Sequence, residues 1–290
     1  MNIINAIFPK TNKAIHGLKA DDFETSKDVG GHGGAIRSKK PIDGKYLFLK
    51  PKTADGTEST NYKIINMDKD LAKWMPKVYG EMEINGRSYL VMENMRKSVD
   101  GSEMQQLVDI KLAGKVDGLN KAIANSKEMK ITRGGKKSAV TKLWMRFVTS
   151  IAPHYLITNG GIRLFDYFQS KTLLKESLAG ISSEHLEKLL EDLIQMQRDI
   201  AQSGIAFIGA SIALIRQKDG SVKPVLIDPA HIQCSNDLNQ QVVQAVGAEG
   251  AKKVFFECLT SEGKNQYQLY KTSNEVALLS IIETVRALRK

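Results

Sequence analysis

Alternating apolar and polar positions predict short strands along much of the chain, and one stretch organises the rest. In residues 107–115, Val108, Ile110 and Leu112 alternate with Asp109 and Lys111. Successive side chains of a strand point to opposite faces, so this strand would present an acid and an amine on one face and an apolar stripe on the other. A sheet can offer two opposite charges to a ligand in this way, although an Asp-x-Lys strand taken alone is more often a solvated pair.

A glycine cluster and a strand that ends in lysine precede this stretch. Glycines gather within residues 29–37, where backbone amides can approach an anion without obstruction by Cβ, although a bare glycine run is usually a flexible turn. The pattern of 45–50 predicts a strand ending at Lys50. Residues 58–73 have the apolar spacing of a helix, and Glu58 near its start can point back toward Lys50. This order outlines a phosphate-binding hairpin but not a Walker loop, because Gly-x-x-x-x-Gly-Lys-Ser/Thr does not occur.

Apolar periodicity later in the chain predicts a further hairpin, a long helix and a strand that ends in an acid. Asn85-Gly86 between two apolar runs is a strong hairpin signal. Residues 182–203 have the spacing of an amphipathic helix. The run at 224–227 predicts a buried strand ending at Asp228. An aspartate in that place is costly unless it is paired or binds a metal, and both alternatives stay open.

The composition is that of an ordinary globular protein. The chain has 290 residues, of which 42% are hydrophobic and 26% charged, enough for one domain of two lobes or two small domains. No segment approaches the ~18 to 20 apolar residues of a membrane span, and residues 1–10 hold too short an apolar run for a secretory signal. We therefore expect a cytoplasmic location, with export by another route left open. Cys234 and Cys258 lack paired spacing and are expected to be reduced thiols.

The net charge of +10 favours a polyanionic partner. Nucleic acid, an anionic membrane surface and a phosphorylated small molecule all fit this charge. The sequence holds no zinc-finger, RNA-recognition or basic-zipper pattern and no obvious platform for base stacking. We therefore expect no nucleic acid partner, leave an anionic membrane surface open, and expect a monomer.

Several short motifs resemble those of the inositol polyphosphate kinases, and they occur in the family's order between residues 30 and 232. Each motif is degenerate, but their joint order is fairly specific. The chain departs from the family pattern at Gln105, Ala113 and Pro229, so we expect a divergent member. The matching segments are Gly31-His32-Gly33, Leu49-Lys50-Pro51, Glu58-Ser59-Thr60-Asn61-Tyr62, Pro76-Lys77-Val78-Tyr79-Gly80, Met92-Glu93-Asn94-Met95, the strand from Gln105 to Ala113, Ala210-Ser211-Ile212-Ala213-Leu214 and Ile227-Asp228-Pro229-Ala230-His231.

The resemblance implies an α+β fold of the two-lobed, kinase-like inositol polyphosphate kinase type, with an antiparallel sheet in each lobe and packed helices. It implies ATP and Mg²⁺ as cofactors and an inositol polyphosphate as the substrate, phosphorylated on a hydroxyl or a phosphate. The implied organisation is an N-terminal lead-in over 1–28, an ATP-binding lobe over 29–95 and a catalytic lobe over 96–290. An insertion around 116–180 would bind the inositol phosphate.

The same resemblance implies roles for residues around the nucleotide. Lys50 would hold the α- and β-phosphates of ATP, and Glu58 would orient Lys50. Glu93 and Met95 would offer backbone groups to adenine. Asp109 would accept hydrogen bonds from the ribose hydroxyls.

Further residues are implied at the metal and at the substrate. Lys111 would contact the transferred phosphate and the inositol hydroxyl. Asp228 would bind Mg²⁺, with Ser211 and His231 as weaker candidates for supporting the metal. The basic residues implied at the substrate phosphates, for which a role as solvated charges stays open, are Lys115, Arg133, Lys136 and Lys137.

Two other functions stay open on the sequence alone. A kinase with the same ATP site would act on a phosphoinositide lipid or a protein, although the His-Arg-Asp and Asp-Phe-Gly motifs of conventional protein kinases are absent. The irregular Gln105 and Pro229 positions motivate the other alternative, a non-catalytic pseudokinase that binds an inositol phosphate.

Overall fold

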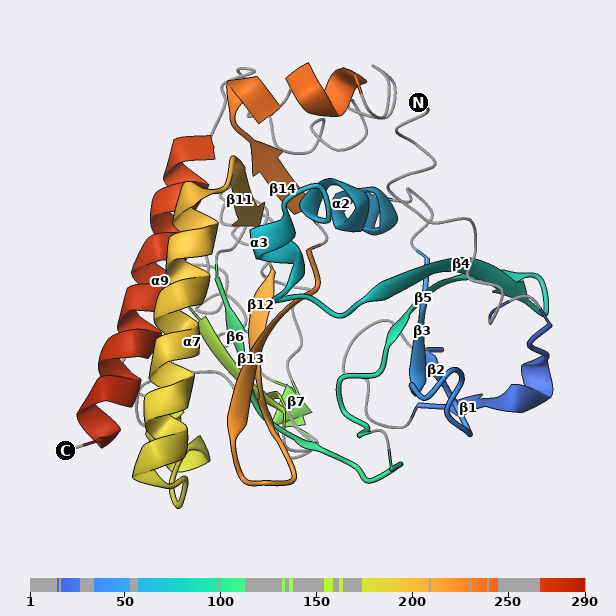
Figure 1. Cartoon of the computed structure of the whole chain (residues 1–290), viewed down its shortest axis with the longest axis horizontal. Helices are drawn as coiled ribbons and strands as arrows, with labels where there is room; N and C mark the ends of the chain where they lie inside the picture. The colour runs from blue at the N-terminus through green and yellow to red at the C-terminus, as the bar shows by residue number, and fades with distance from the viewer. Residues whose placement is uncertain are drawn as a thin grey trace.

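Two antiparallel five-stranded sheets form the frame of the protein (Figure 1). Helices pack on these sheets, which gives the predicted α+β fold. One antiparallel sheet is formed by strands before residue 95 and the other by strands after it. The structure is a computed structural model, and it describes residues 15, 17–26, 34–52, 57–98, 100–112, 132–133, 136–137, 154–158, 162–163, 174–208, 210–229, 231–238, 240–244 and 267–289.

The first sheet consists of β1 (Phe23–Thr25), β2 (Ile36–Ser38), β3 (Leu47–Pro51), β4 (Val78–Ile84) and β5 (Arg87–Glu93), and the 3-10 helix η1 (Ala20–Asp22) precedes it. The order across the sheet is β1-β2-β3-β5-β4. The β4–β5 hairpin turns at Asn85 and Gly86, whose φ angles of 51° and 73° fit the tight turn that the sequence predicts. β1 lies inside the predicted lead-in and forms an edge of this sheet.

The alternation of β3 gives the two faces of the first sheet different partners. Leu47 and Leu49 are buried in an outer cluster with Val91 of β5. Phe48 points the other way and packs against the main core of the protein. Lys50 is two residues beyond Phe48 and therefore leaves the strand on the same face, toward the main core.

Two short helices connect β3 to β4 and join the main core. They are α2 (Thr57–Ile65) and α3 (Lys69–Ala72). The single helix expected over 58–73 is divided because Asp68 caps α3, its side chain accepting backbone hydrogen bonds from the first turn. After α3, the carbonyl oxygen of Trp74 accepts a hydrogen bond from Leu226 N at 2.7 Å. The segment after α3 thus contacts the second sheet. The division into lobes at residue 95 stays a prediction.

The second sheet consists of β6 (Gln105–Lys111), β9 (His154–Thr158), β10 (Ile162–Arg163), β12 (Ser211–Arg216) and β13 (Val222–Ile227). Its order is β10-β9-β6-β12-β13, and the pairings are antiparallel. Val108 and Ile110 of β6 enter the main core. Asp109 alternates with them and pairs with Ala213 of β12, so position 109 belongs to the other face of the sheet.

Two long helices, α7 (Ser183–Gln202) and α9 (Tyr267–Leu288), lie side by side and pack on the second sheet (Figure 1). α7 begins where the Ser182 hydroxyl accepts a hydrogen bond from His185 N at 3.3 Å. Leu189 and Leu193 of α7 and Ile281 of α9 are fully buried in the main core. Within the described ranges, no helix is long and apolar enough to cross a membrane.

A side chain of α9 completes a small two-stranded sheet made of β11 (Ile205–Ile208) and β14 (His231–Cys234). Asn274 Oδ1 accepts a hydrogen bond from Phe207 N at 2.7 Å, and Asn274 Nδ2 donates to Phe207 O at 3.0 Å. The amide thus takes the place of a neighbouring strand and satisfies buried backbone groups. The remaining elements are β7 (Thr132–Arg133) and β8 (Lys136–Lys137), which pair with each other, and helical segments at 174–177, 236–238 and 240–244.

Lys271 of α9 is buried beside the end of α7. Its ammonium group donates to Ile200 O, to Ile205 O at 3.2 Å and to the Ser203 hydroxyl at 3.3 Å. The last carbonyls of a helix lack hydrogen-bond donors within that helix, and the ammonium group of Lys271 is such a donor for Ile200 O. Desolvation lowers the pKa of Lys271 to about 8, because the negative charge of Glu275 offsets it only in part.

Replacing Lys271 by methionine is expected to change how stability depends on pH. Lys271 titrates at a pH of about 8 in the folded protein, and a lysine in an unfolded chain titrates near 10.4. Between these values the unfolded state binds more protons, so the free energy of unfolding rises with pH, by an amount on the order of 3 kcal/mol. Urea unfolding from about pH 8 to pH 10 should show this rise in the native protein and in Lys175→Met, an exposed control, but not in Lys271→Met. An unchanged rise in Lys271→Met would assign it to another group.

Candidate active site

Lys50 lies between two carboxylates that are far apart in the sequence. Its Nζ is 2.7 Å from Glu58 Oε1 and 2.7 Å from Asp228 Oδ1. Lys50 comes from β3 of the first sheet, Glu58 from the first turn of α2, and Asp228 directly follows β13 of the second sheet. The first contact is the one expected from the helix spacing. The second joins the two sheets and was not expected.

The three side chains differ in burial. Glu58 is 8% exposed, Lys50 22% and Asp228 45%. Desolvation alone would lower the pKa of Lys50, but the charges and hydrogen bonds of Asp228 and Glu58 together raise it above 10.5. Lys50 is therefore a fixed cation at neutral pH, with an enclosed acid on one side and an accessible acid on the other.

Asp228 has an uncommon backbone conformation. Its φ angle is 54°, in the left-handed region that few residues other than glycine adopt, although aspartate tolerates it better than most. The strand β13 ends one residue earlier, at Ile227, which pairs with Ser211 of β12. Holding a residue in this region costs on the order of 1 kcal/mol, so contacts around Asp228 must stabilise it.

Two residues of α2 contact the backbone at Asp228. Asn61 Nδ2 donates a hydrogen bond to Pro229 O at 2.8 Å in a buried setting. The phenol group of Tyr62 forms a hydrogen bond with the backbone of Asp228, and this bond by itself would lower the pKa of Tyr62. Since it favours the phenolate, the backbone N–H of Asp228 is the donor. Burial, with the nearby charges of Glu58 and Asp228, raises the pKa of Tyr62 well above 10. Asn61 and Tyr62 had no predicted role beyond the helix, although their spacing from Glu58 places all three on one helix face.

A cavity of about 260 Å³ lies at the segment that follows β5. Glu93 and Met95, the residues predicted to meet adenine, both line it. Glu93 N donates to Lys77 O at 2.8 Å, and the Glu93 carboxylate pairs with Lys45 at 2.8 Å. Met95 packs against a small apolar cluster around Ala213 on the face of the second sheet that position 109 shares. The cavity therefore borders both sheets.

The metal site proposed from the sequence can be tested against the groups near Asp228. Mg²⁺ is usually held by one or two carboxylates together with phosphates and waters, and the half-exposed carboxylate of Asp228 fits that need. Ser211 is fully buried, and its hydroxyl has no hydrogen-bond partner among the described residues. His231 is half-buried at the start of β14. No three His, Cys, Asp or Glu side chains form a cluster within the described ranges, so a metal here would rely on Asp228 and on the ligand's phosphates.

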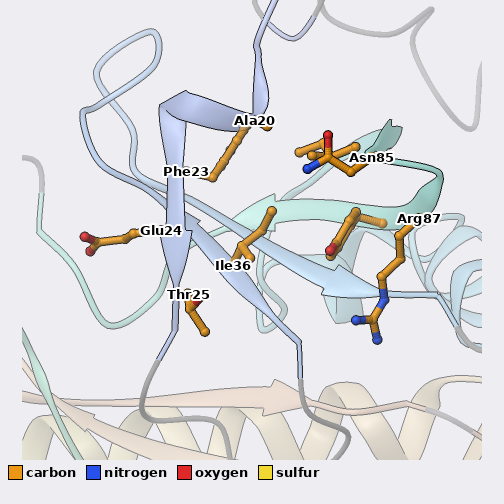
Figure 2. Close-up of a pocket in the computed structure, with 9 residues that line it drawn as sticks. Ala20, Phe23, Glu24, Thr25, Ile36, Asn85 and Arg87 are labelled. Atoms are coloured by element: carbon orange, nitrogen blue, oxygen red, sulfur yellow. The ribbon is translucent and has the colours of Figure 1, made fainter.

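A second cavity, of about 290 Å³, lies on the face of the first sheet that carries the outer cluster (Figure 2). Phe23 and Tyr89, which line it, belong to the outer cluster and not to the main core. Figure 2 shows Glu24 and Arg87 on different sides of it, and Glu24 pairs with Arg37 at 2.7 Å. The residues predicted for the site do not line this cavity.

Several predicted residues cannot be placed relative to Lys50. The glycine run at 29–33, Lys115 and Cys258 lie outside the described residues. The backbone positions of Asp109 and Lys111 pair with Ala213 and Ser211, but their side chains lie outside the described part of the structure. The same holds for the basic residues of β7 and β8, which are Arg133, Lys136 and Lys137.

Solved structures with a partly similar fold include the following two. The crystal structure of the inositol phosphate multikinase Ipk2 from S. cerevisiae, in complex with ADP and Mn²⁺, is 14% identical, and the match covers 84% of this chain and 99% of that chain with a TM-score of 0.49. A type-2 SAICAR synthetase in complex with ADP is 15% identical, with 78% and 95% coverage and a TM-score of 0.31. No protein-family model and no curated protein sequence matches the chain. A similarity of this size does not assign a function, which rests on the geometry of the site.

Lys50→Met is expected to destabilise the protein, because it leaves the enclosed Glu58 without this cation. Removing one partner of a buried ion pair typically costs about 3 to 5 kcal/mol. Since Asp228 is partly exposed, we expect a loss of about 3 kcal/mol in the free energy of unfolding, measured by urea denaturation at neutral pH.

Lys45→Met is the matched control. Lys45 pairs with Glu93 at 2.8 Å but is 48% exposed, so its loss should cost less than about 1 kcal/mol. Similar small losses in both variants would contradict a stabilising role for the buried pair.

Proposed function

We propose that this chain is an ATP- and Mg²⁺-dependent kinase that phosphorylates an inositol polyphosphate. The placement of Lys50 between Glu58 and Asp228 is the observation that carries the proposal. Phosphoryl transfer depends on charges fixed around the moving phosphate, because its transition state is stabilised mainly by electrostatics. A lysine oriented by a glutamate on a helix supplies a fixed positive charge, and the accessible carboxylate beside it can hold a metal ion.

The difference in exposure between the two acids suits nucleotide binding. Lys50 turns from Asp228 to the α- and β-phosphates of ATP, while the enclosed Glu58 keeps it oriented. Asp228 then becomes available to a metal ion. Mg²⁺, when bound, supplies positive charge beside the phosphates. The backbone of Glu93 and Met95 binds the adenine in the 260 Å³ cavity, and Asp109 binds the ribose.

Strand register supports a role for Lys111 at the transferred phosphate. Lys111 pairs with Ser211, and Ser211 pairs with Ile227, which directly precedes Asp228. Adjacent strands lie about 4.8 Å apart, so the backbone at position 111 is roughly 10 Å from that of Ile227. Lys111 at this distance contacts the transferred phosphate and the substrate hydroxyl, which acts as the nucleophile.

The charge of the whole chain supports a highly anionic substrate. The net charge is +10, and an inositol polyphosphate carries many negative charges. The basic residues that contact its phosphates in this proposal are Lys115, Arg133, Lys136 and Lys137.

Measuring ATP consumption with Mg²⁺ over a panel of soluble inositol phosphates tests this function. We expect turnover with at least one compound, and a loss of about 100-fold or more in Asp228→Asn. Asparagine also tolerates the left-handed region, so the melting temperature of this variant should stay close to that of the native protein. Turnover only on phosphoinositide vesicles or on a protein would contradict the proposed substrate. Binding of an inositol phosphate without Mg-ATP binding would favour a pseudokinase.

Lys111→Ala separates the substrate role from the nucleotide role. If Lys111 contacts the transferred phosphate, kcat should fall by roughly 100-fold while the Kd for Mg-ATP changes little. Steady-state kinetics and calorimetric titration measure these two quantities. An equal loss of ATP affinity would place Lys111 in the nucleotide site instead.

A further inference from the structure

Helix α2 contacts the segment after β13 at two points and is linked to it through Lys50 at a third. Its Glu58 acts through Lys50, whose Nζ lies 2.7 Å from the carboxylates of both Glu58 and Asp228. Its Tyr62 accepts a hydrogen bond from the backbone N–H of Asp228, and its Asn61 donates to the carbonyl oxygen of the next residue at 2.8 Å. These α2 residues have the i, i+3, i+4 spacing of one helix face. One element therefore contacts the amide of Asp228 and the following carbonyl directly, and it reaches the carboxylate through Lys50.

The backbone at Asp228 needs such support. Its φ of 54° is unfavourable for a residue with a side chain. Asp228 also precedes Pro229, and the ring of a proline restricts the backbone of the residue before it. Local sequence preference therefore does not maintain this conformation, and tertiary contacts have to do so.

α2 itself is held firmly in place. Ile64 and Ile65 at its end are at most 1% exposed and pack in the main core, and the side chains of Asn61 and Tyr62 are equally enclosed. The hydrogen bonds to the Asp228 segment are thus made by groups with little freedom to move. Hydrogen bonds to the groups that ligate a metal orient them, and losing one typically weakens metal binding by about 10- to 100-fold. The bonds from α2 reach the backbone around the ligating residue, so we expect a loss at the lower end of this range.

We propose that Asn61 and Tyr62 are positioning residues that hold Asp228 in its left-handed conformation and thereby set its affinity for the metal ion. This inference rests on the proposed function, since it takes Asp228 as the metal ligand. One helix then fixes both charged groups of the site, the cation through Glu58 and the carboxylate through Asn61 and Tyr62. The two tasks are separable, because losing the Tyr62 or Asn61 contact leaves the contact between Lys50 and Glu58 in place.

Tyr62→Phe tests the inference with little change in packing, because it removes only the hydroxyl. Calorimetric titration of ADP with Mg²⁺ and with EDTA separates metal-dependent from metal-independent affinity. We expect the Mg²⁺-dependent gain in ADP affinity to fall by roughly tenfold in Tyr62→Phe and in Asn61→Leu, with the affinity in EDTA unchanged. Tyr89→Phe is the matched control, since Tyr89 is also buried but belongs to the outer cluster. Equal losses with Mg²⁺ and with EDTA would show a merely structural role and overturn the inference.

Hydrogen–deuterium exchange of the ligand-free protein tests the positioning step without any nucleotide. Both α2 variants should speed exchange in a peptide spanning residues 226–233, where Asp228 N–H loses its acceptor or its neighbour loses its donor, and Tyr89→Phe should not. Unchanged exchange in Tyr62→Phe would overturn the inference. If the native protein binds no nucleotide, the proposed function fails, and the exchange result still decides whether α2 holds Asp228.

Discussion

The ion pair between Lys50 and Asp228 spans 178 residues of sequence and joins the first sheet to the second. Lys50 is largely covered, and removing its charge from water without compensation is costly, so its ammonium group needs partners. Glu58 supplies such a partner from within the same region, and Asp228 supplies the other from the far end of β13. The site thus depends on two acids with different access to solvent around one fixed cation.

The local parts of this arrangement could be predicted from the sequence. Apolar spacing places Glu58 at the start of a helix, where it reaches the lysine at the end of the preceding strand. The Asn85-Gly86 turn and the helix over 182–203 follow from local patterns as well. These features depend on residues close in sequence, so periodicity and turn chemistry are sufficient to find them.

The long-range parts could not be predicted in the same way. The sequence left open whether Asp228 is paired or binds a metal, because its partner Lys50 is brought to it only by the packing of one sheet against the other. The contacts of Asn61 with Pro229 and of Asn274 with Phe207 are hydrogen bonds from side chains to distant backbone groups, which no periodicity encodes. The helix break at Asp68 is a local signal, an N-cap aspartate, that the apolar stripe concealed.

The central claim is that the groups around Lys50 and Asp228 bind a nucleotide and its metal. A crystal structure with Mg²⁺ and a non-hydrolysable ATP analogue tests it most directly. The account predicts phosphate oxygens on Lys50, the metal on the carboxylate of Asp228 and the base against the backbone of Glu93 and Met95. A nucleotide bound elsewhere, such as in the cavity beside Arg87, or a metal that does not touch Asp228, would contradict it.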